Sequence, residues 1–293
     1  MELTSHFKGL LHNIEPDTAA VAIAKKAHET LRTTLHNDPE LSGADPDTYL
    51  SGSYARDTAL KRIKDVDVIL LLDIDYSITE PEVLLAWLQA SVQKKYPSAT
   101  LQGRSVCVTT GNGFDLDIVP AVPISHRSGA VRIPDRDVKQ WVATDPKGQL
   151  DFSVKKNAST GGFYKPVVKL MKHWRDRLPI ESARAKSYLL ESLVAGTMST
   201  TPDSYAHAVA NAFRSINSTY SVYLALGSVP RVPDPGYSAV NVAKRWKFDE
   251  FKAFMEHLNA ASATANAALK EPNEDASAKG WKTLFGQDFK ITD

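Results

Sequence analysis

Two aspartates separated by a single residue, Asp65 and Asp67, stand at the start of an apolar run in this sequence. Because side chains alternate along a β-strand, both carboxylates would emerge on the same face. Two such carboxylates repel each other unless a cation lies between them. Mg²⁺ prefers oxygen ligands and commonly binds one or two carboxylates together with phosphate oxygens. The pair therefore suits a site for a metal ion and a triphosphate, although two solvated charges at a strand end would give the same pattern.

The residues after Asp67 distinguish this carboxylate from an ordinary surface charge. Residues 68–72 read Val-Ile-Leu-Leu-Leu, which is typical of a strand that is buried on both faces. A charge within such a strand is costly unless it has a partner. The sequence therefore favours a functional role for Asp67.

A Gly-Ser turn precedes the acid pair. Residues 48–50 are expected to form a short strand that ends at Gly52-Ser53 and continues into a helical turn. In such a turn, backbone N–H groups can approach a phosphate closely, Ser53 adds a hydroxyl donor and Arg56 adds a fixed charge. A structural glycine turn capped by serine is the competing interpretation. The glycine-rich signatures of P-loop and dinucleotide-binding proteins are absent from the sequence, which weighs against kinases and NAD-type enzymes.

The elements that would position these residues follow from the apolar periodicity. The expected strands cover residues 48–50, 66–73, 101–110 and 114–119. The expected helices cover residues 17–36, 80–96, 163–177, 184–198, 204–220 and 248–269. Residues 133–146 are expected to be irregular, and the proline-rich stretch 227–241 is expected to be a long connector.

This order of elements predicts two lobes. Strands are concentrated in the first half of the chain, and helical periodicity dominates after about residue 155. We expect an α+β fold with a mixed-sheet catalytic lobe over residues 1–155 and a helical lobe over residues 156–293. An N-terminal helix would be able to pack across both.

The composition is that of an ordinary globular protein. The chain has 293 residues and a net charge of +1, so any basic surface for nucleic acid must be local. The single cysteine, Cys107, excludes an internal disulfide and a cysteine-based zinc site, and its strand-like neighbours indicate a core residue. Neither a signal-peptide pattern nor a long apolar run is present, so we expect a cytoplasmic protein without a membrane segment.

The combination of motifs is more specific than its parts. Gly52-Ser53 followed by Asp65-Val66-Asp67 resembles the hG[GS]…Dh[DE]h signature of the polymerase-beta-like nucleotidyltransferase superfamily. In that superfamily a third carboxylate follows on a neighbouring strand. Asp115 and Asp117 are the candidates, and strand alternation leaves both open because they share a face. The resemblance favours Asp117, because it directly precedes Ile-Val-Pro-Ala, and leaves Asp115 as the alternative.

A closer resemblance extends over nearly the whole chain. The sequence is similar to the cGAS/DncV-like nucleotidyltransferases (the SMODS family), the bacterial relatives of cyclic GMP-AMP synthase and oligoadenylate synthase. The segments that carry the similarity are Asp-Ile-Val-Pro-Ala at 117–121, Lys-Leu-Met-Lys-His-Trp at 169–174, Lys-Ser-Tyr-Leu-Leu-Glu at 186–191 and Trp-Lys-Thr-Leu-Phe-Gly at 281–286.

This resemblance implies roles for particular residues. Asp65, Asp67 and Asp117 would be catalytic and would bind two Mg²⁺ ions, with Mn²⁺ as a possible substitute. Nucleotide binding would fall to Gly52, Ser53, Lys172, Ser187 and Tyr188, with Tyr188 stacking on a base. Two other interpretations stay open from the residues themselves, since Lys172 suits a surface lysine and Tyr188 suits a core aromatic.

The implied reaction joins NTPs, most readily ATP or GTP, into a cyclic di- or trinucleotide that signals in bacterial anti-phage defence (CBASS). The resemblance also implies possible CBASS regulatory partner proteins, as some relatives need a partner and others do not. Zinc-dependent DNA sensing is not expected because no Cys/His insertion is present. One alternative is a terminal nucleotidyltransferase that extends RNA, against which the neutral charge argues. The other is a catalytically silent nucleotide-binding module, against which the retained acids argue.

Overall fold

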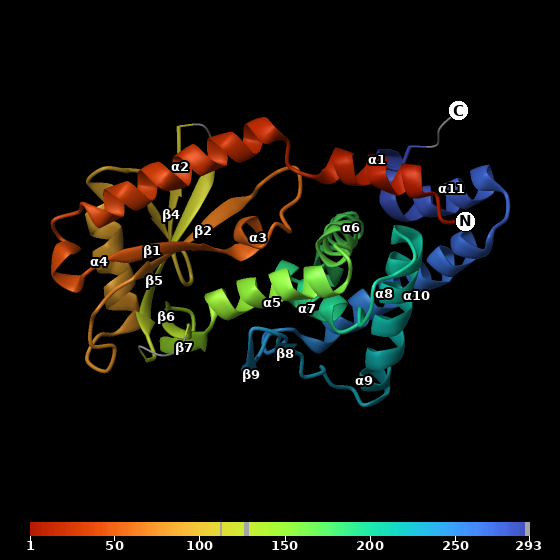
Figure 1. Cartoon of the computed structure of the whole chain (residues 1–293). Coiled ribbons are helices and arrows are strands. Elements are labelled where there is room, and N and C mark those ends of the chain that lie inside the picture. Colours follow the sequence, from red (N-terminus) through yellow and green to blue (C-terminus); the bar gives the residue numbers. More distant parts are fainter. Residues whose placement is uncertain (112, 126–128, 291–293) are drawn as a thin grey trace. The chain divides into compact units, whose positions relative to one another are not determined.

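The computed structural model describes residues 1–111, 113–125 and 129–290 (Figure 1). The chain divides into two compact units. The first, here called the sheet unit, is Pro16–Asp151, and the second, the helical unit, combines Met1–Glu15 with Phe152–Asp293. This division differs from the expected lobes in one main respect, since it groups the first 15 residues with the C-terminal helices.

A mixed β-sheet is the framework of the sheet unit. Its strands within the described residues are β1 (Asp47–Ser51), β2 (Asp65–Leu71), β3 (Thr100–Leu101), β4 (Val106–Thr109), β5 (Asp115–Pro123), β6 (Val131–Asp135) and β7 (Gln140–Thr144). The order is β1-β2-β5-β4-β3, and β6 pairs with β5 and β7. Only the β2–β5 pair is parallel among the pairs of described strands. The α+β prediction with a mixed sheet is confirmed.

The hairpin of β6 and β7 corrects one expectation, because residues 133–146 were predicted to be irregular. Pro134 lies in β6 and faces Trp141 of β7. Proline lacks an N–H group and is tolerated where no ladder bond is required of it. Within β6, only Val131 and Arg132 pair with β5, so Pro134 needs no such bond toward β5. The proline therefore did not end the strand.

Two long helices bury one face of the sheet. They are α2 (Thr18–His36), capped by Asp17 through a 2.7 Å bond from the Ala20 N–H, and α4 (Pro81–Gln93). Their apolar residues share a core with alternate residues of β2, and Ile69 of the same strand belongs to a smaller cluster on the other face. Strand β2 is thus buried on both faces, as its apolar run predicted. The one-turn helix α3 (Gly52–Ala55) connects β1 to the segment before β2.

The helical unit is organised by aromatic contacts. Its helices are α1 (Thr4–Ile14), most of α5 (Pro146–Ser159), α6 (Tyr164–Asp176), α7 (Ser187–Ala195), α8 (Tyr205–Tyr220), α9 (Val222–Ala225), α10 (Phe248–Lys270) and α11 (Glu274–Phe285). The ring of Trp174 meets Phe213 and Phe254 edge-on, and Phe7 of α1 packs against Trp281. Short 3₁₀ turns occur at Ser42–Ala44, Glu181–Ala183 and Gly286–Asp288.

A small hairpin interrupts the predicted connector. Strands β8 (Pro233–Asp234) and β9 (Tyr237–Asn241) pair across a turn in which the Asp234 carboxylate accepts from the Gly236 N–H at 2.8 Å. The sequence pattern did not predict a strand here, because the two residues of β8 are too few to show an alternation of apolar and polar side chains. Within residues 1–111, 113–125 and 129–290, no helix has both the length and the apolar character that crossing a membrane requires.

Candidate active site

The parallel pairing of β2 and β5 brings the predicted acids together. In the register of the two strands, Asp65 faces Asp115 and Asp67 faces Asp117. Both strands start at these residues, so the carboxylates gather at one end of the sheet. Residues far apart in the chain thus form one acidic cluster, which is the arrangement that the sequence predicted.

The Gly-Ser turn lies directly against this cluster. Gly52 begins α3 with φ of +71°, a conformation that side chains rarely adopt. A Cβ atom at Gly52 would lie 1.7 Å from Oδ2 of Asp67. The carboxylate of Asp67 therefore packs against the backbone of the turn at a distance that only glycine permits. Ser53 follows as the next residue of α3 and is half-buried.

The electrostatics of the cluster are those of crowded like charges. Burial raises the pKa of Asp67 to about 7, and the negative charges of Asp65 and Asp117 add to the increase. The nearby positive charge of Arg56, whose side chain is buried, lowers the same pKa. The pKa of Asp117 is also raised, first by burial and then by Asp65. A bound cation would relieve this repulsion.

Asp117 differs from Asp115 in what its oxygens contact. The carboxylate of Asp115 accepts a 2.7 Å hydrogen bond from Thr109 Oγ1. Asp117 is buried and hydrogen-bonds with Cys107 and Ser105, but its Oδ1 has no hydrogen-bond partner. A buried, unsatisfied oxygen is costly and suits a position where a ligand or cation supplies the missing contact. This observation favours Asp117 as the third acid.

Cys107 has a contact that its sequence did not predict. The residue is buried, as expected of a core cysteine. However, its side chain adjoins Asp117, and burial together with the charge of that aspartate raises the pKa of the thiol to about 11. The thiol therefore stays protonated near neutral pH and can donate to the carboxylate.

The donor set fits a hard cation, since several carboxylate oxygens gather at this end of the sheet. As the side chains stand, no group of three or more His, Cys, Asp or Glu residues in the described part of the chain forms a ready metal site. A cation at the cluster would thus require small rotations of the carboxylates toward a common point. Such a rotation would give a ligand contact to Oδ1 of Asp117, which has no hydrogen-bond partner.

The remaining predicted residues lie at the facing ends of α6 and α7 in the helical unit. Lys172 is not a surface lysine, because its side chain is only 3% exposed and its Nζ lies 2.6 Å from Oε1 of Glu191. Ser187 is the first residue of α7 and accepts a hydrogen bond from Arg175. The sequence did not single out Glu191, although a glutamate four residues after Ser187 belongs to the same helix face.

Tyr188 is half-buried, and its hydroxyl donates a 2.6 Å hydrogen bond to Asp234 of the small hairpin. This bond fixes the ring by its polar end and ties α7 to β8. The contact is compatible with either predicted role, because a tyrosine held by its hydroxyl can still offer a ring face.

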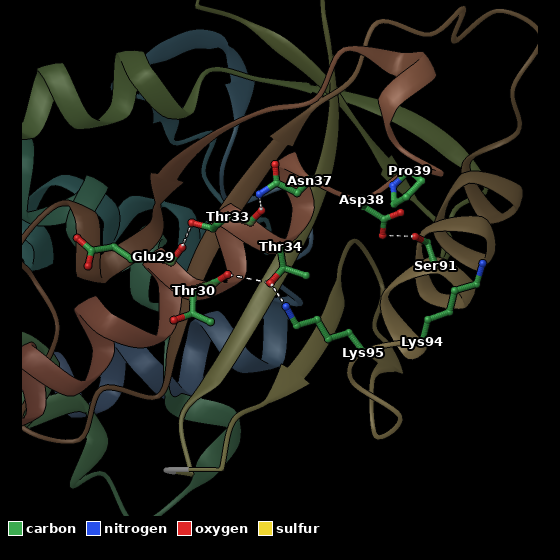
Figure 2. A pocket seen from close by; sticks show the side chains of 10 residues that line it. All are labelled: Glu29, Thr30, Thr33, Thr34, Asn37, Asp38, Pro39, Ser91, Lys94 and Lys95. Carbon is green, nitrogen blue, oxygen red and sulfur yellow. Dashed lines mark hydrogen bonds between the residues drawn. The ribbon is translucent and has the colours of Figure 1, made fainter.

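A cavity of about 600 Å³ occurs elsewhere in the sheet unit, between the C-terminal halves of α2 and α4 (Figure 2). Threonines of α2 line one side, and the side chain of Lys95 reaches across to Thr34 with a 3.0 Å hydrogen bond. None of the predicted site residues lines this cavity. The candidate active site is therefore defined by the acidic cluster rather than by this cavity.

Comparison with known proteins identifies the family. Residues 1–157 match the family model described as Second Messenger Oligonucleotide or Dinucleotide Synthetase domain (SMODS). A cyclic AMP-AMP-AMP synthase of Acinetobacter sp. is 33% identical over 99% of this chain and 86% of its own length. A probable cyclic AMP-AMP-GMP nucleotide synthase of Salmonella paratyphi B is 26% identical over 99% of this chain and 92% of its own.

Solved structures share the fold over the whole chain. CdnC of E. coli MS115-1, solved with ATP and in a complex with HORMA-deltaN, superposes with a TM-score of 0.78 at 20% identity and covers 98% of this chain and at least 98% of its own. The CD-NTase CdnG of Bradyrhizobium diazoefficiens, solved with GTP, has a TM-score of 0.82 at 16% identity and covers 97% and 96%. The resemblance seen in the sequence is confirmed: the chain belongs to the SMODS family of cGAS/DncV-like nucleotidyltransferases, whose members are cyclic oligonucleotide synthases.

Proposed function

We propose that this enzyme joins NTPs, with ATP or GTP as substrates, into a cyclic di- or trinucleotide that acts as a second messenger in CBASS anti-phage signalling. The observation that carries the proposal is the acidic cluster of β2 and β5, packed against the backbone of the Gly52 turn. A relative with 33% identity is named a cyclic AMP-AMP-AMP synthase, which supports ATP as a substrate.

The acidic cluster is the proposed metal site. Asp65, Asp67 and Asp117 would hold two Mg²⁺ ions, for which Mn²⁺ can substitute. When bound, the metal ions would offset the charge of the carboxylates and of the triphosphate, and would lower the pKa of the attacking hydroxyl. Asp117 is the residue proposed to accept the proton of that hydroxyl, because its Oδ1 has no hydrogen-bond partner in the protein.

The triphosphate is proposed to lie over the Gly-Ser turn. The backbone N–H groups at the start of α3 can donate to phosphate oxygens, and the absence of a side chain at Gly52 keeps the approach open. The Ser53 hydroxyl would supply a further donor. These groups orient the α-phosphate for attack without moving protons themselves.

The helical unit is proposed to contribute Lys172, Ser187 and Tyr188 to nucleotide binding. Ser187 Oγ accepts from Arg175, so the proton of this hydroxyl remains free to donate to a phosphate oxygen. Tyr188, held by Asp234, would stack on a base. Lys172 would add the positive charge.

A regulatory protein partner is also part of the proposal. CdnC of E. coli MS115-1, which shares this fold, was solved in a complex with HORMA-deltaN. A protein of that kind is the partner we propose to test for an effect on product yield.

The test is mass spectrometry of the products that the purified protein forms from all four NTPs with Mg²⁺. We expect a cyclic, phosphatase-resistant oligonucleotide, and a loss of about 1,000-fold in its rate of formation in Asp67→Ala. Asp47→Asn, which alters an exposed acid of the same sheet, should retain activity. Full activity of Asp67→Ala would refute the assigned metal site.

Two other outcomes would replace the proposal. Extension of a labelled RNA in preference to cyclisation would indicate a terminal nucleotidyltransferase. Measurable ATP binding without turnover in any NTP mixture, with or without the partner, would indicate a silent nucleotide-binding module.

A further inference from the structure

Two contacts between polar side chains link α6 to α7. Nζ of Lys172 lies 2.6 Å from Oε1 of Glu191, and Nη1 of Arg175 donates to Ser187 Oγ at 3.2 Å. Lys172 and Arg175 are three residues apart on α6, and Ser187 and Glu191 are four residues apart on α7, so each pair shares one helix face. These contacts connect two of the proposed nucleotide-binding residues, Lys172 and Ser187, to Glu191 and Arg175.

The Lys172–Glu191 ion pair is almost completely buried. The side chains are 3% and 1% exposed. Burying two charges carries a desolvation cost that their attraction only roughly repays, and apolar side chains of similar volume often give equal or greater stability. Stability alone therefore does not account for charges at these two positions.

The surrounding contacts hold Glu191 rigidly in place. Its backbone carbonyl accepts a hydrogen bond from the Tyr164 hydroxyl at 3.2 Å, which ties this turn of α7 to the start of α6. Arg175 also donates to the Ala185 carbonyl at 2.7 Å, which fixes the segment leading into α7. The carboxylate is thus presented to Lys172 from a fixed backbone, while the lysine has a long, flexible side chain.

We propose that Glu191 is a positioning residue that holds the Lys172 ammonium as its internal counter-ion and competes with the nucleotide triphosphate for that ammonium. This inference rests on the proposed role of Lys172 in triphosphate binding. The carboxylate keeps the buried lysine charged and aligned when no nucleotide is bound. It also weakens ATP binding, because the triphosphate must share a charge that Glu191 already offsets.

The experiment measures the Kd of ATP by calorimetry in EDTA, without a divalent cation, so that the acidic cluster does not contribute. Glu191→Gln removes the charge and preserves the shape, and we expect ATP to bind about three- to tenfold tighter. Glu191→Asp keeps the charge and should stay within about twofold of wild type. If Glu191 competes for the charge of Lys172, the Kd changes in Glu191→Gln but not in Glu191→Asp. If its role is merely structural, the melting temperature falls in both variants and the Kd stays unchanged.

A double-mutant cycle supplies the second measurement. Lys172→Met should weaken ATP binding, and the apolar pair Lys172→Met with Glu191→Leu should fold and bind as weakly as Lys172→Met alone. If Lys172→Met leaves the Kd unchanged, the proposed role of Lys172 is wrong. If Lys172→Met weakens binding but Glu191→Gln does not tighten it, the role of Lys172 stands and the inference about Glu191 is overturned.

Discussion

The two groups of candidate residues differ in how their buried charges are balanced. In the sheet unit, Asp65, Asp67 and Asp117 crowd like charges together, and burial with mutual repulsion raises the pKa of Asp67 to about 7. In the helical unit, the buried Lys172 is matched by Glu191 at 2.6 Å. The acidic cluster therefore gains stability from a ligand that the chain does not supply, whereas the helical pair is complete before any ligand binds. Charge changes should consequently have different effects in the two units.

The largest expected effect is on the stability of the helical unit. Lys172→Met leaves the Glu191 carboxylate buried without its cation, so the free energy of unfolding should fall by about 3–5 kcal/mol. Asp67→Asn removes one of several crowded charges and should leave the stability of the metal-free protein unchanged or slightly higher. Urea unfolding of both variants in EDTA checks this contrast. Equal losses of unfolding free energy in the two variants would contradict it.

The next effect concerns the contact between Gly52 and the acidic cluster. A Cβ at Gly52 would overlap Oδ2 of Asp67, so Gly52→Ala must displace the carboxylate, and we expect at least a 100-fold lower rate of product formation, on the order of the loss of one transition-state contact. Gly113→Ala is the matched control, because Gly113 also has a positive φ of +76° but nothing lies within 4 Å of its Cβ position. The control should lose about 1 kcal/mol of stability and keep its rate. Similar rates for the two variants would show that the overlap is relieved without cost.

The smallest effect is the dependence of stability on pH and metal. The pKa of Asp67 in the folded protein is about 7, above its ordinary value of 3.8, so the folded state binds this proton more tightly than the unfolded state. The metal-free protein should then lose stability as pH rises from about 4 to about 7. Mg²⁺ should restore it, with a rise in melting temperature of a few degrees at pH 8 and little change at pH 5. Asp67→Asn should show a smaller pH trend, because the raised pKa of Asp117 remains, and a weaker response to Mg²⁺. An undiminished Mg²⁺ response in this variant would place the cation elsewhere.

The sequence was informative where a local pattern has a single structural solution. The apolar run after Asp67 required a doubly buried strand, and β2 is one. The family resemblance rested on short motifs in a fixed order, and the comparisons confirm it. The expected irregular segment at residues 133–146 was wrong, because whether Pro134 interrupts a strand depends on which edge its neighbours pair with. No local signal contains that information.

The residues of the site also separate what the sequence could predict from what required the structure. Alternation placed Asp115 and Asp117 on one face and left the choice to the family pattern. The environment of each oxygen distinguishes them, since Thr109 satisfies Asp115 while Oδ1 of Asp117 has no partner. Lys172 suited a surface position by its residue type, yet it is buried against Glu191. The catalytic and nucleotide-binding roles of these residues stay predictions until the variants are measured.

The sequence by itself determined the family and the fold class, because these follow from residue type, spacing and order along the chain, and it predicted which acids would form the cluster. Only the tertiary structure decided that the Gly52 turn closes against Asp67, that Cys107 adjoins Asp117 and that Lys172 is paired rather than exposed. The physical reason is that each of these facts is a contact between segments distant in sequence. Burial and pKa depend on the atoms that surround a group in space, and the pairing of strands and helices sets those atoms.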